Sequence, residues 1–265
     1  VSDWLWGGNI SLINKLTITN SIYFTLSRGY LTGGINQHPK LVAINRPYEP
    51  EHMINIEIGH KWLTSEFSIQ TSLFYSLRSD QQVSLSTQQD PEDPNSFFFY
   101  RANAAKGRNS GIEVESNYSF SPILRAHLSL ALLDSYVNSF EYTGPNGVEL
   151  SGDRESAHAP QYRTHFGIEW SSYLGFFAKV AGTHTSDFYF SESHNESSDA
   201  YSLVDGSFGY VIEGYRFEGW IRNIFDERYA TRGFFFSLEP PDYKEKLYKS
   251  YGDPRQIGLR FTKDW

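Results

Sequence analysis

Apolar and polar side chains alternate along most of this chain. Between Ile54 and Ile58, and through most of the stretch from Phe67 to Tyr75, every second residue is apolar. Successive side chains of a β-strand point to opposite faces of the sheet, so each such segment has one apolar face and one polar face. The chain is therefore expected to be all-β, and its connections decide between a soluble sandwich and a membrane barrel.

The links between these segments are short and long in strict alternation. We expect about twelve strands, and those that can be delimited span residues 3–12, 17–30, 51–62, 66–86, 97–119, 123–138, 160–170, 174–188, 201–212, 215–225 and 253–261. Short links fall near residues 13–16, 63–65, 121–122, 171–173 and 213–214. Long links fall near residues 31–50, 87–96, 141–159, 189–199 and 226–252.

This alternation is typical of bacterial outer-membrane barrels, which have short periplasmic turns and long extracellular loops. Several strands exceed the roughly 5–6 residues common in globular sheets and reach the roughly 9–11 residues that cross a bilayer at a tilt. We therefore predict that residues 1–265 form one transmembrane antiparallel up-and-down β-barrel domain in the bacterial outer membrane. Its C-terminus is expected on the periplasmic side and its long loops outside the cell.

Composition agrees with a barrel and excludes several other classes of protein. Aromatic residues make up 17% of the chain, and barrels use such residues as girdles at both membrane interfaces. The mean hydropathy of -0.47 resembles that of a soluble protein, but inward polar residues lower this average in any barrel. The net charge of -8 argues against a nucleic-acid partner. Cysteine is absent, which excludes disulfides and thiolate chemistry, and neither a metal site nor a cofactor is predicted.

Short motifs lie at the expected strand ends in a fixed order. They are Pro50 and Glu51; Asn103, Gly107, Gly111 and Glu113; Asn223, Phe225, Asp226 and Tyr229; and Pro254, Arg255 and Phe261. With these motifs the chain resembles the C-terminal half of the barrel of TonB-dependent outer-membrane receptors. We expect most of these residues to be structural: Gly107 and Gly111 relieve crowding, Pro254 opens a strand, and Asn223 caps a strand end.

The resemblance implies a barrel of roughly 22 strands filled by an N-terminal plug domain. About twelve strands are expected here, and nothing in the chain matches the plug or the TonB box, so we expect the C-terminal part of such a barrel. The implied function is TonB-dependent uptake of a scarce nutrient, most often a ferric siderophore or another iron complex, and not enzymatic catalysis. The implied partners are outer-membrane lipid, the TonB complex acting through the missing plug, and the barrel-assembly machinery. That machinery would read the C-terminal strand, with Trp265 as a candidate terminal aromatic.

Three loop clusters combine aromatic residues with arginine. They are Arg46 and Tyr48; Phe97, Tyr100 and Arg101; and Arg232, Phe234 and Phe235. Such side chains suit an anionic ligand that carries aryl groups, as ferric siderophores do. The same aromatic residues could instead form the girdle at the outer leaflet. Both interpretations stay open at this stage.

Two other functions are alternatives to a receptor. A self-contained channel or translocator of twelve strands would pair strand 3–12 with strand 253–261 and close the barrel. An outer-membrane hydrolase would need a nucleophile beside a base, and His127 and Ser129 share one face of a strand. No further hydrolase signature accompanies that pair, so the hydrolase is the weaker alternative.

Overall fold

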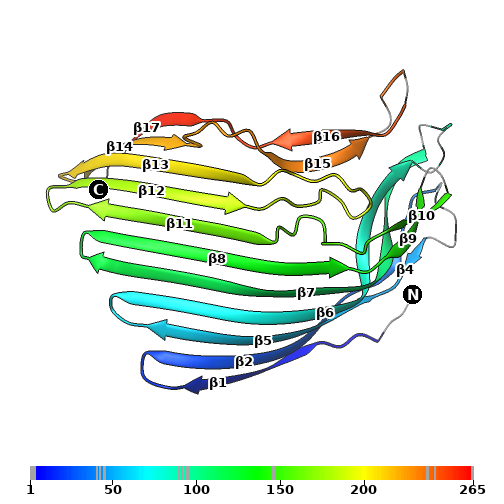
Figure 1. The fold of residues 1–265 in the computed structure, drawn as a ribbon, viewed down its shortest axis with the longest axis horizontal. Helices are drawn as coiled ribbons and strands as arrows, with labels where there is room; N and C mark the ends of the chain where they lie inside the picture. The colour runs from blue at the N-terminus through cyan, green and yellow to red at the C-terminus, as the bar shows by residue number, and fades with distance from the viewer. Residues whose placement is uncertain are drawn as a thin grey trace.

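One antiparallel sheet dominates the computed structural model, which describes residues 4–39, 41, 43, 46–88, 90, 92–93, 96–144, 147–236, 239–241 and 243–263. The order of its eleven strands is β1-β2-β5-β6-β7-β8-β11-β12-β13-β14-β17 (Figure 1). Their bounds are β1 Gly8–Lys15, β2 Asn20–Leu31, β5 Glu51–Leu63, β6 Phe67–Gln88, β7 Phe97–Ser121, β8 Leu124–Val137, β11 Tyr162–Ser171, β12 Phe176–Thr185, β13 Tyr201–Ile212, β14 Tyr215–Arg222 and β17 Gln256–Lys263. None of the described segments is a helix of the length and hydropathy needed to cross a bilayer.

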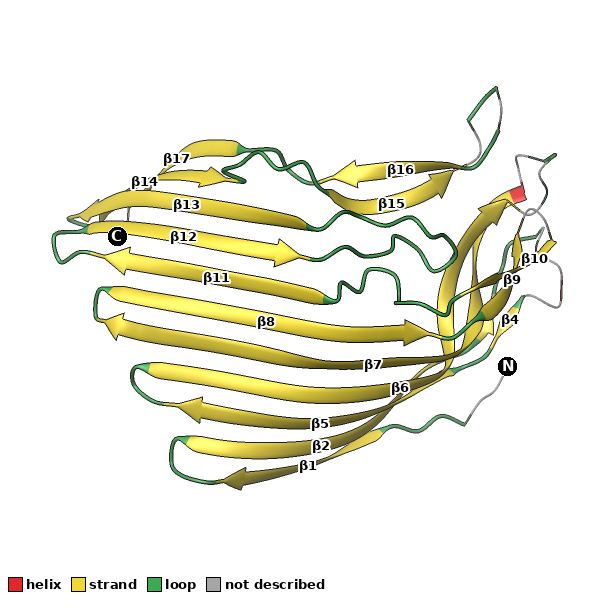
Figure 2. Ribbon diagram, in the orientation of Figure 1, coloured by secondary structure: helices red, strands yellow, loops and turns green. Residues whose placement is uncertain are grey.

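Three hairpins lie outside this sheet, each within a long link. They are β3 (Gly34–Ile35) with β4 (Pro47–Tyr48), β9 (Phe140–Gly144) with β10 (Gly147–Ser151), and β15 (Ala230–Phe236) with β16 (Lys246–Tyr251) (Figure 2). The predicted alternation of links is confirmed, because the short turns gather at one end of the sheet with the C-terminus and the long links at the other (Figure 1). About twelve strands were expected, and the sheet has eleven. In the described residues, each of the eleven ranges given above forms one strand, and no twelfth strand joins the sheet.

The two faces of the sheet differ as the alternation predicts. Cross-strand partners such as Leu73, Ile112 and Leu132 form rows on an apolar face, and this face is open, with Ile58 52% and Leu259 92% exposed. The opposite, polar face carries Glu57, Gln70 and Glu115, among others. An apolar face of this extent is unfavourable in water and suits contact with lipid.

Most of the buried hydrophobic residues lie at the long-link end of the molecule, whereas Phe177 of β12 is buried near the short turns. Strands β6 and β7 pair along their whole length as far as Gln88 and Phe97, and their far ends bend away from the wall (Figure 1). They pack with the links into a core formed by Leu41, Val83, Leu85, Phe98, Tyr100, Val137 and Phe140. We call the described residues of 32–50, 81–104, 137–161, 186–200 and 223–255 the loop layer. The loop layer has its own hydrophobic core, so its links are packed against one another.

Glycines on the sheet make room for aromatic rings from the neighbouring strand. Tyr23 of β2 lies flat over Gly59 of β5, where its hydroxyl donates to Glu57 Oε1 at 2.6 Å. Further pairs of this kind are Phe74 with Gly111, Phe166 with Gly182, Phe177 with Gly209, and Trp220 with Gly258. A ring over a glycine covers backbone that would otherwise be exposed, which stabilises a curved sheet.

We expect Gly59→Val to destabilise the sheet by about 1–3 kcal/mol, because the new side chain overlaps the Tyr23 ring and breaks its hydrogen bond to Glu57. The measurement is the urea dependence of unfolding in lipid vesicles. Gly29→Val is the control, since a Cβ at Gly29 meets nothing within 4 Å. Equal stability of the two variants would contradict the proposed role of Gly59.

Candidate functional site

The motif residues near Glu51 and Asn103 meet at the bend where β6 leaves the wall. Asp80 has a φ of 54° there, and Glu51 spans the bend with both carboxylate oxygens. Arg78 Nε donates to Glu51 Oε1 at 2.6 Å, and the backbone amide of Gln82 donates to Oε2 at 2.8 Å. Glu51 is 3% exposed, so this ion pair is largely shielded from water.

Asn103 of β7 stabilises the same bend by hydrogen bonds. Its side-chain amide donates to the carbonyl of Asp80 at 2.7 Å and to that of Glu49 at 3.0 Å, and its Oδ1 accepts the amide of Glu49 at 2.8 Å. Gly107 leaves the space that the buried Gln81 side chain fills. These motif residues, with the buried Pro50 beside Glu51, therefore hold the loop layer onto the wall.

A second group of motif residues holds the entry to β17. Asn223 is 5% exposed with a φ of 47°, and its Nδ2 donates to the carbonyls of Glu227 at 2.9 Å and Asp253 at 3.1 Å. Its Oδ1 accepts the amide of Glu227 at 2.9 Å. Asp226 Oδ1 accepts the amide of Arg255 at 2.8 Å, immediately after Pro254. This group fixes the end of β14 against the start of β17.

The remaining motif residues lie along the strands and their ends. Tyr229 covers Gly252 and packs on Tyr201 with ring centroids 4.6 Å apart. Glu113 and Gly111 are on the polar face, where Phe74 covers the glycine. Phe225 is 72% exposed, and Phe261 is 60% exposed on the apolar face beside Phe217. Trp265, the candidate terminal aromatic, lies outside the described residues.

The first predicted ligand cluster is engaged in contacts within the loop layer. Arg46 donates from Nε to the carbonyl of Leu41 at 3.0 Å and from a terminal nitrogen to that of Pro39 at 3.0 Å. The ring of Tyr48 lies over Gly34 within the β3–β4 hairpin. Arg101 of the second predicted cluster lies nearby; it is exposed, and its guanidinium group donates to Gln82 Oε1 at 3.3 Å. These contacts order the loops around β3 and β4.

The other two clusters come together, although they are more than a hundred residues apart. Phe97 at the tip of β7 lies edge-on to Phe236 of β15, with centroids 6.2 Å apart. Tyr100 and Phe235 are each 6% exposed, so packing takes up both rings. The other members are open: Phe234 is 40% exposed and stacks on Tyr248, and Arg232 is exposed.

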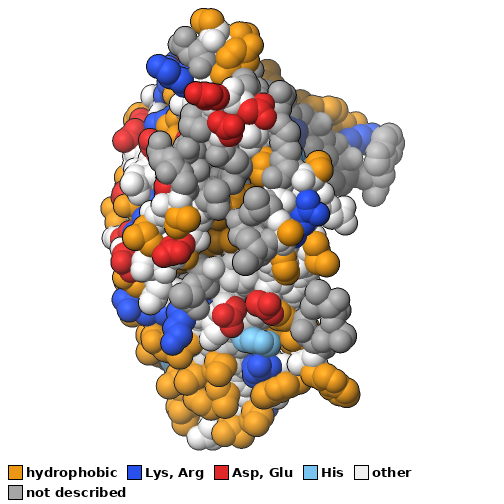
Figure 3. Space-filling model, turned by 90° about the vertical axis from the view of Figure 1, so that its right-hand side faces the viewer, with side chains coloured by type: hydrophobic (Ala, Val, Ile, Leu, Met, Phe, Trp, Pro, Cys, Tyr) orange, Lys and Arg blue, Asp and Glu red, His pale blue; other side chains and the backbone are white. Residues whose placement is uncertain are grey.

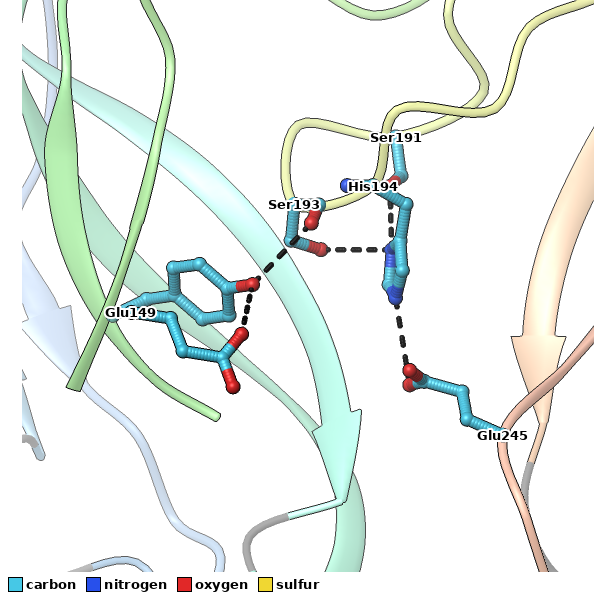
Figure 4. A network of polar contacts seen from close by, with 6 residues as sticks. Glu149, Ser191, Ser193, His194 and Glu245 are labelled. Carbon is cyan, nitrogen blue, oxygen red and sulfur yellow. Dashed lines mark hydrogen bonds and ion pairs between the residues drawn. The ribbon is translucent and has the colours of Figure 1, made fainter. Parts of the chain in front are cut away.

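A polar pocket of about 550 Å³ opens in the loop layer around His194. His194 stacks on Phe235 with centroids 3.6 Å apart, and its Nδ1 lies 2.8 Å from Ser191 Oγ and 3.1 Å from Ser193 Oγ. Its Nε2 lies 3.4 Å from Glu245 Oε1 (Figure 4). Tyr142 donates to Glu149 Oε2 at 2.8 Å on the opposite side of the pocket.

The pocket is acidic. Its described lining includes Glu149, Glu196 and Glu245 but no lysine or arginine. Burial and the bond to Glu149 raise the pKa of the Tyr142 hydroxyl, which therefore stays protonated as a donor. Next to the pocket, burial raises the pKa of the Glu192 carboxyl, which accepts the amide of Ala157 at 2.9 Å. Acidic side chains also appear in several groups at this end of the molecule (Figure 3).

Sequence reasoning missed the residues of this pocket apart from Phe235, which lies behind His194. Tyr142, Glu149, His194 and Glu245 come from the β9–β10 hairpin, the link after β12 and the segment before β16, with no shared local motif. The only sequence signal was that each belongs to a long link. Among the described residues, no group of three or more His, Asp or Glu side chains could hold a metal ion.

His127 and Ser129 share the polar face, as expected, but His127 contacts a histidine. Its Nε2 lies 3.0 Å from His165 Nε2, and its ring lies over Gly167. The arrangement is a histidine pair between neighbouring strands, and no serine–histidine contact is formed there among the described residues.

The chain is similar to known proteins over most of its length. Residues 2–224 match the family model "TonB dependent receptor-like, beta-barrel". The pesticin receptor of Yersinia pestis is 24% identical over 231 residues, which are 86% of this chain and 32% of that receptor. The chain thus spans about a third of the length of the curated relatives that it matches.

Solved structures show the same fold. The ferric yersiniabactin uptake receptor FyuA of Yersinia pestis superposes with a TM-score of 0.78 at 21% identity, over 98% of this chain and 37% of that one. The ferric-catecholate import receptor Fiu of E. coli K12 gives a TM-score of 0.69 at 15% identity, over 97% of this chain and 34% of that one. The eleven-stranded sheet therefore corresponds to part of a larger barrel in these structures.

Proposed function

The chain belongs to the family of TonB-dependent receptor-like β-barrels, and from this membership we propose that it forms the wall and part of the mouth of a receptor that takes up an iron complex. The family implies the bacterial outer membrane. We place the short turns and the C-terminus in the periplasm and the loop layer outside the cell. The proposed partners are outer-membrane lipid, the barrel-assembly machinery, and TonB acting through a plug domain that is not part of residues 1–265.

The observation that carries this proposal is the pocket around His194. It opens at the long-link end, where a ligand arriving from outside would first meet the protein, and side chains from three separate links line it. Pockets that combine an aromatic ring with a few fixed polar groups are typical ligand sites. Its carboxylates favour a ferric chelate that is neutral or positively charged over a highly anionic one.

The other two functions have less support. A self-contained channel needs a ladder between β1 and β17, and in the described residues these two strands are the unpaired edges of the sheet. A hydrolase needs a base beside a nucleophile, and His127 instead contacts His165. The family comprises receptors and transporters, which also favours uptake over catalysis.

We expect the double variant Glu149→Gln with Glu245→Gln to bind a cationic ferric hydroxamate about tenfold more weakly, a loss of about 1.4 kcal/mol. The cause is the removal of two carboxylates that face the pocket, while glutamine keeps the hydrogen-bonding oxygens. Binding of an anionic ferric catecholate is expected to stay the same or become tighter. The measurement is fluorescence quenching on outer-membrane vesicles that contain the protein, with the iron-free chelators as blanks.

The control is Glu66→Gln with Glu213→Gln, which removes the same charge at the short-turn end. It should leave both affinities unchanged. Equal affinity of the wild-type protein and the pocket variant for the cationic chelate would contradict the assignment of this pocket.

A further inference from the structure

A second cavity lies on the apolar face, far from the His194 pocket. It is a groove of about 420 Å³ between β1, β2 and β5, lined by Trp6, Gly8, Ile10, Leu26, Arg28 and Ile54, with Asn9 and Ser27. Hydrophobic side chains gather at this edge of the molecule, at the bottom of the view in Figure 3. Gly8 helps to open the groove, because a Cβ there would meet no atom within 4 Å.

The groove has one charged residue, Arg28, and it lies on the apolar face. Arg28 pairs with Gly8 on one side and Ile54 on the other, two residues beyond Leu26 on the same face. The apolar run of β5 ends at the same level, since the next residue on that face is His52. Arg28 therefore lies where the apolar band ends on the long-link side, at the depth of lipid headgroups.

The guanidinium group of Arg28 is held in place by its neighbours, but these contacts engage only some of its N–H donors. Its centre lies 4.0 Å from the centroid of the Trp6 ring, and it donates to the carbonyl of Trp6 and contacts His52 Nδ1 at 3.2 Å. An arginine has five N–H donors, so these two contacts leave donors free. None of the described carboxylates forms an ion pair with Arg28. Arg108 lies in the same row of cross-strand partners as Arg28. Unlike Arg28, it has a carboxylate partner, because its terminal nitrogen lies 3.7 Å from Asp134 Oδ2.

We propose that this groove binds one anionic phospholipid. An acyl chain lies along Leu26, Ile10 and Ile54, and the phosphate accepts hydrogen bonds from Arg28 at the upper end. A fixed planar guanidinium group matches the geometry of a phosphate, and the apolar side chains of the groove pack along the acyl chain. The inference rests on the membrane location proposed above and is independent of the transported ligand.

The test is native mass spectrometry of the protein extracted from outer membranes in mild detergent, with phosphatidylglycerol or phosphatidylcholine of identical acyl chains added. We expect the anionic lipid to bind at least about fivefold more tightly than the zwitterionic one. Arg28→Gln should abolish that preference, and Gly8→Leu should weaken binding of both lipids because its side chain fills the groove. An excess of inorganic phosphate should not displace the lipid.

Each variant has a matched control. Arg163→Gln removes an arginine from the polar face of β11, and Gly29→Leu adds the same side chain to the polar face of β2, where a Cβ meets nothing within 4 Å. Both should bind lipid as the wild-type protein does. Equal binding of the two lipids by the wild-type protein, or lipid binding unchanged in Gly8→Leu, would overturn the proposal. Displacement by phosphate alone would reduce the site to an anion site and would also overturn it.

Discussion

Replacing Glu51 with alanine is expected to lower the free energy of unfolding by about 3–5 kcal/mol, among the largest effects of any single change in this chain. The carboxylate is 3% exposed and is the ion-pair partner of Arg78, whose side chain is 24% exposed. Without it, the guanidinium charge is left half-buried and unpaired, and the amide of Gln82 loses its acceptor. Such a loss exceeds that of a surface ion pair, which is typically about 0–1 kcal/mol.

The measurement is urea-induced unfolding in lipid vesicles, combined with hydrogen exchange to locate the damage. Exchange should accelerate first around Gln82, where β6 enters the loop layer. Glu113→Ala is the control, because this glutamate on the same polar face is exposed and should change stability by less than about 0.5 kcal/mol. The double variant Glu51→Met with Arg78→Met should recover part of the loss, since neither charge then stays unpaired. Equal destabilisation by Glu51→Ala and Glu113→Ala would contradict a special role for this ion pair.

Strands and faces were predictable from the sequence because they depend on local periodicity. A period of two residues indicates a strand wherever it occurs, and Gly107 or Pro254 marks an irregular point without reference to the rest of the fold. The meeting of Glu51 and Asn103 at Asp80 was not predictable, because it depends on the pairing register of β5, β6 and β7. Register brings together residues that are distant in sequence. The local pattern of one strand does not show which residues of the neighbouring strand it will pair with.

The candidate ligand site was less predictable for a related reason. Residue type suggested arginine and aromatic side chains, but Tyr100 and Phe235 alternate with exposed neighbours and their rings turn inward to pack. The pocket that the fold builds instead depends on His194 and Glu245, which carry no local signature and approach each other only when two links pack together. Long links predict the end of the barrel at which a ligand would bind, and their packing decides which side chains line a pocket there.

The second large effect is expected at Asn223, where alanine should cost about 3 kcal/mol or more. Its φ of 47° is in the left-handed region, which costs alanine about 1–2 kcal/mol more than glycine or asparagine. Alanine also removes three side-chain hydrogen bonds, to Glu227 twice and to Asp253 once, each of which contributes about 1 kcal/mol at a buried position. The start of β17 should then separate from the end of β14.

Two further variants divide this effect into its parts. Asn223→Gly keeps the left-handed backbone and loses only the hydrogen bonds, so it should be destabilised by about 1–2 kcal/mol less than Asn223→Ala. Asn117→Ala removes an exposed asparagine of β7 near the short-turn end and should change stability by no more than about 0.5 kcal/mol. Unfolding in urea gives the three values, and hydrogen exchange at Arg255, whose amide is bound by Asp226, reports the local opening. If the glycine and alanine variants were equally stable, the left-handed backbone would contribute nothing, and the loss would belong to the hydrogen bonds that join β14 to β17.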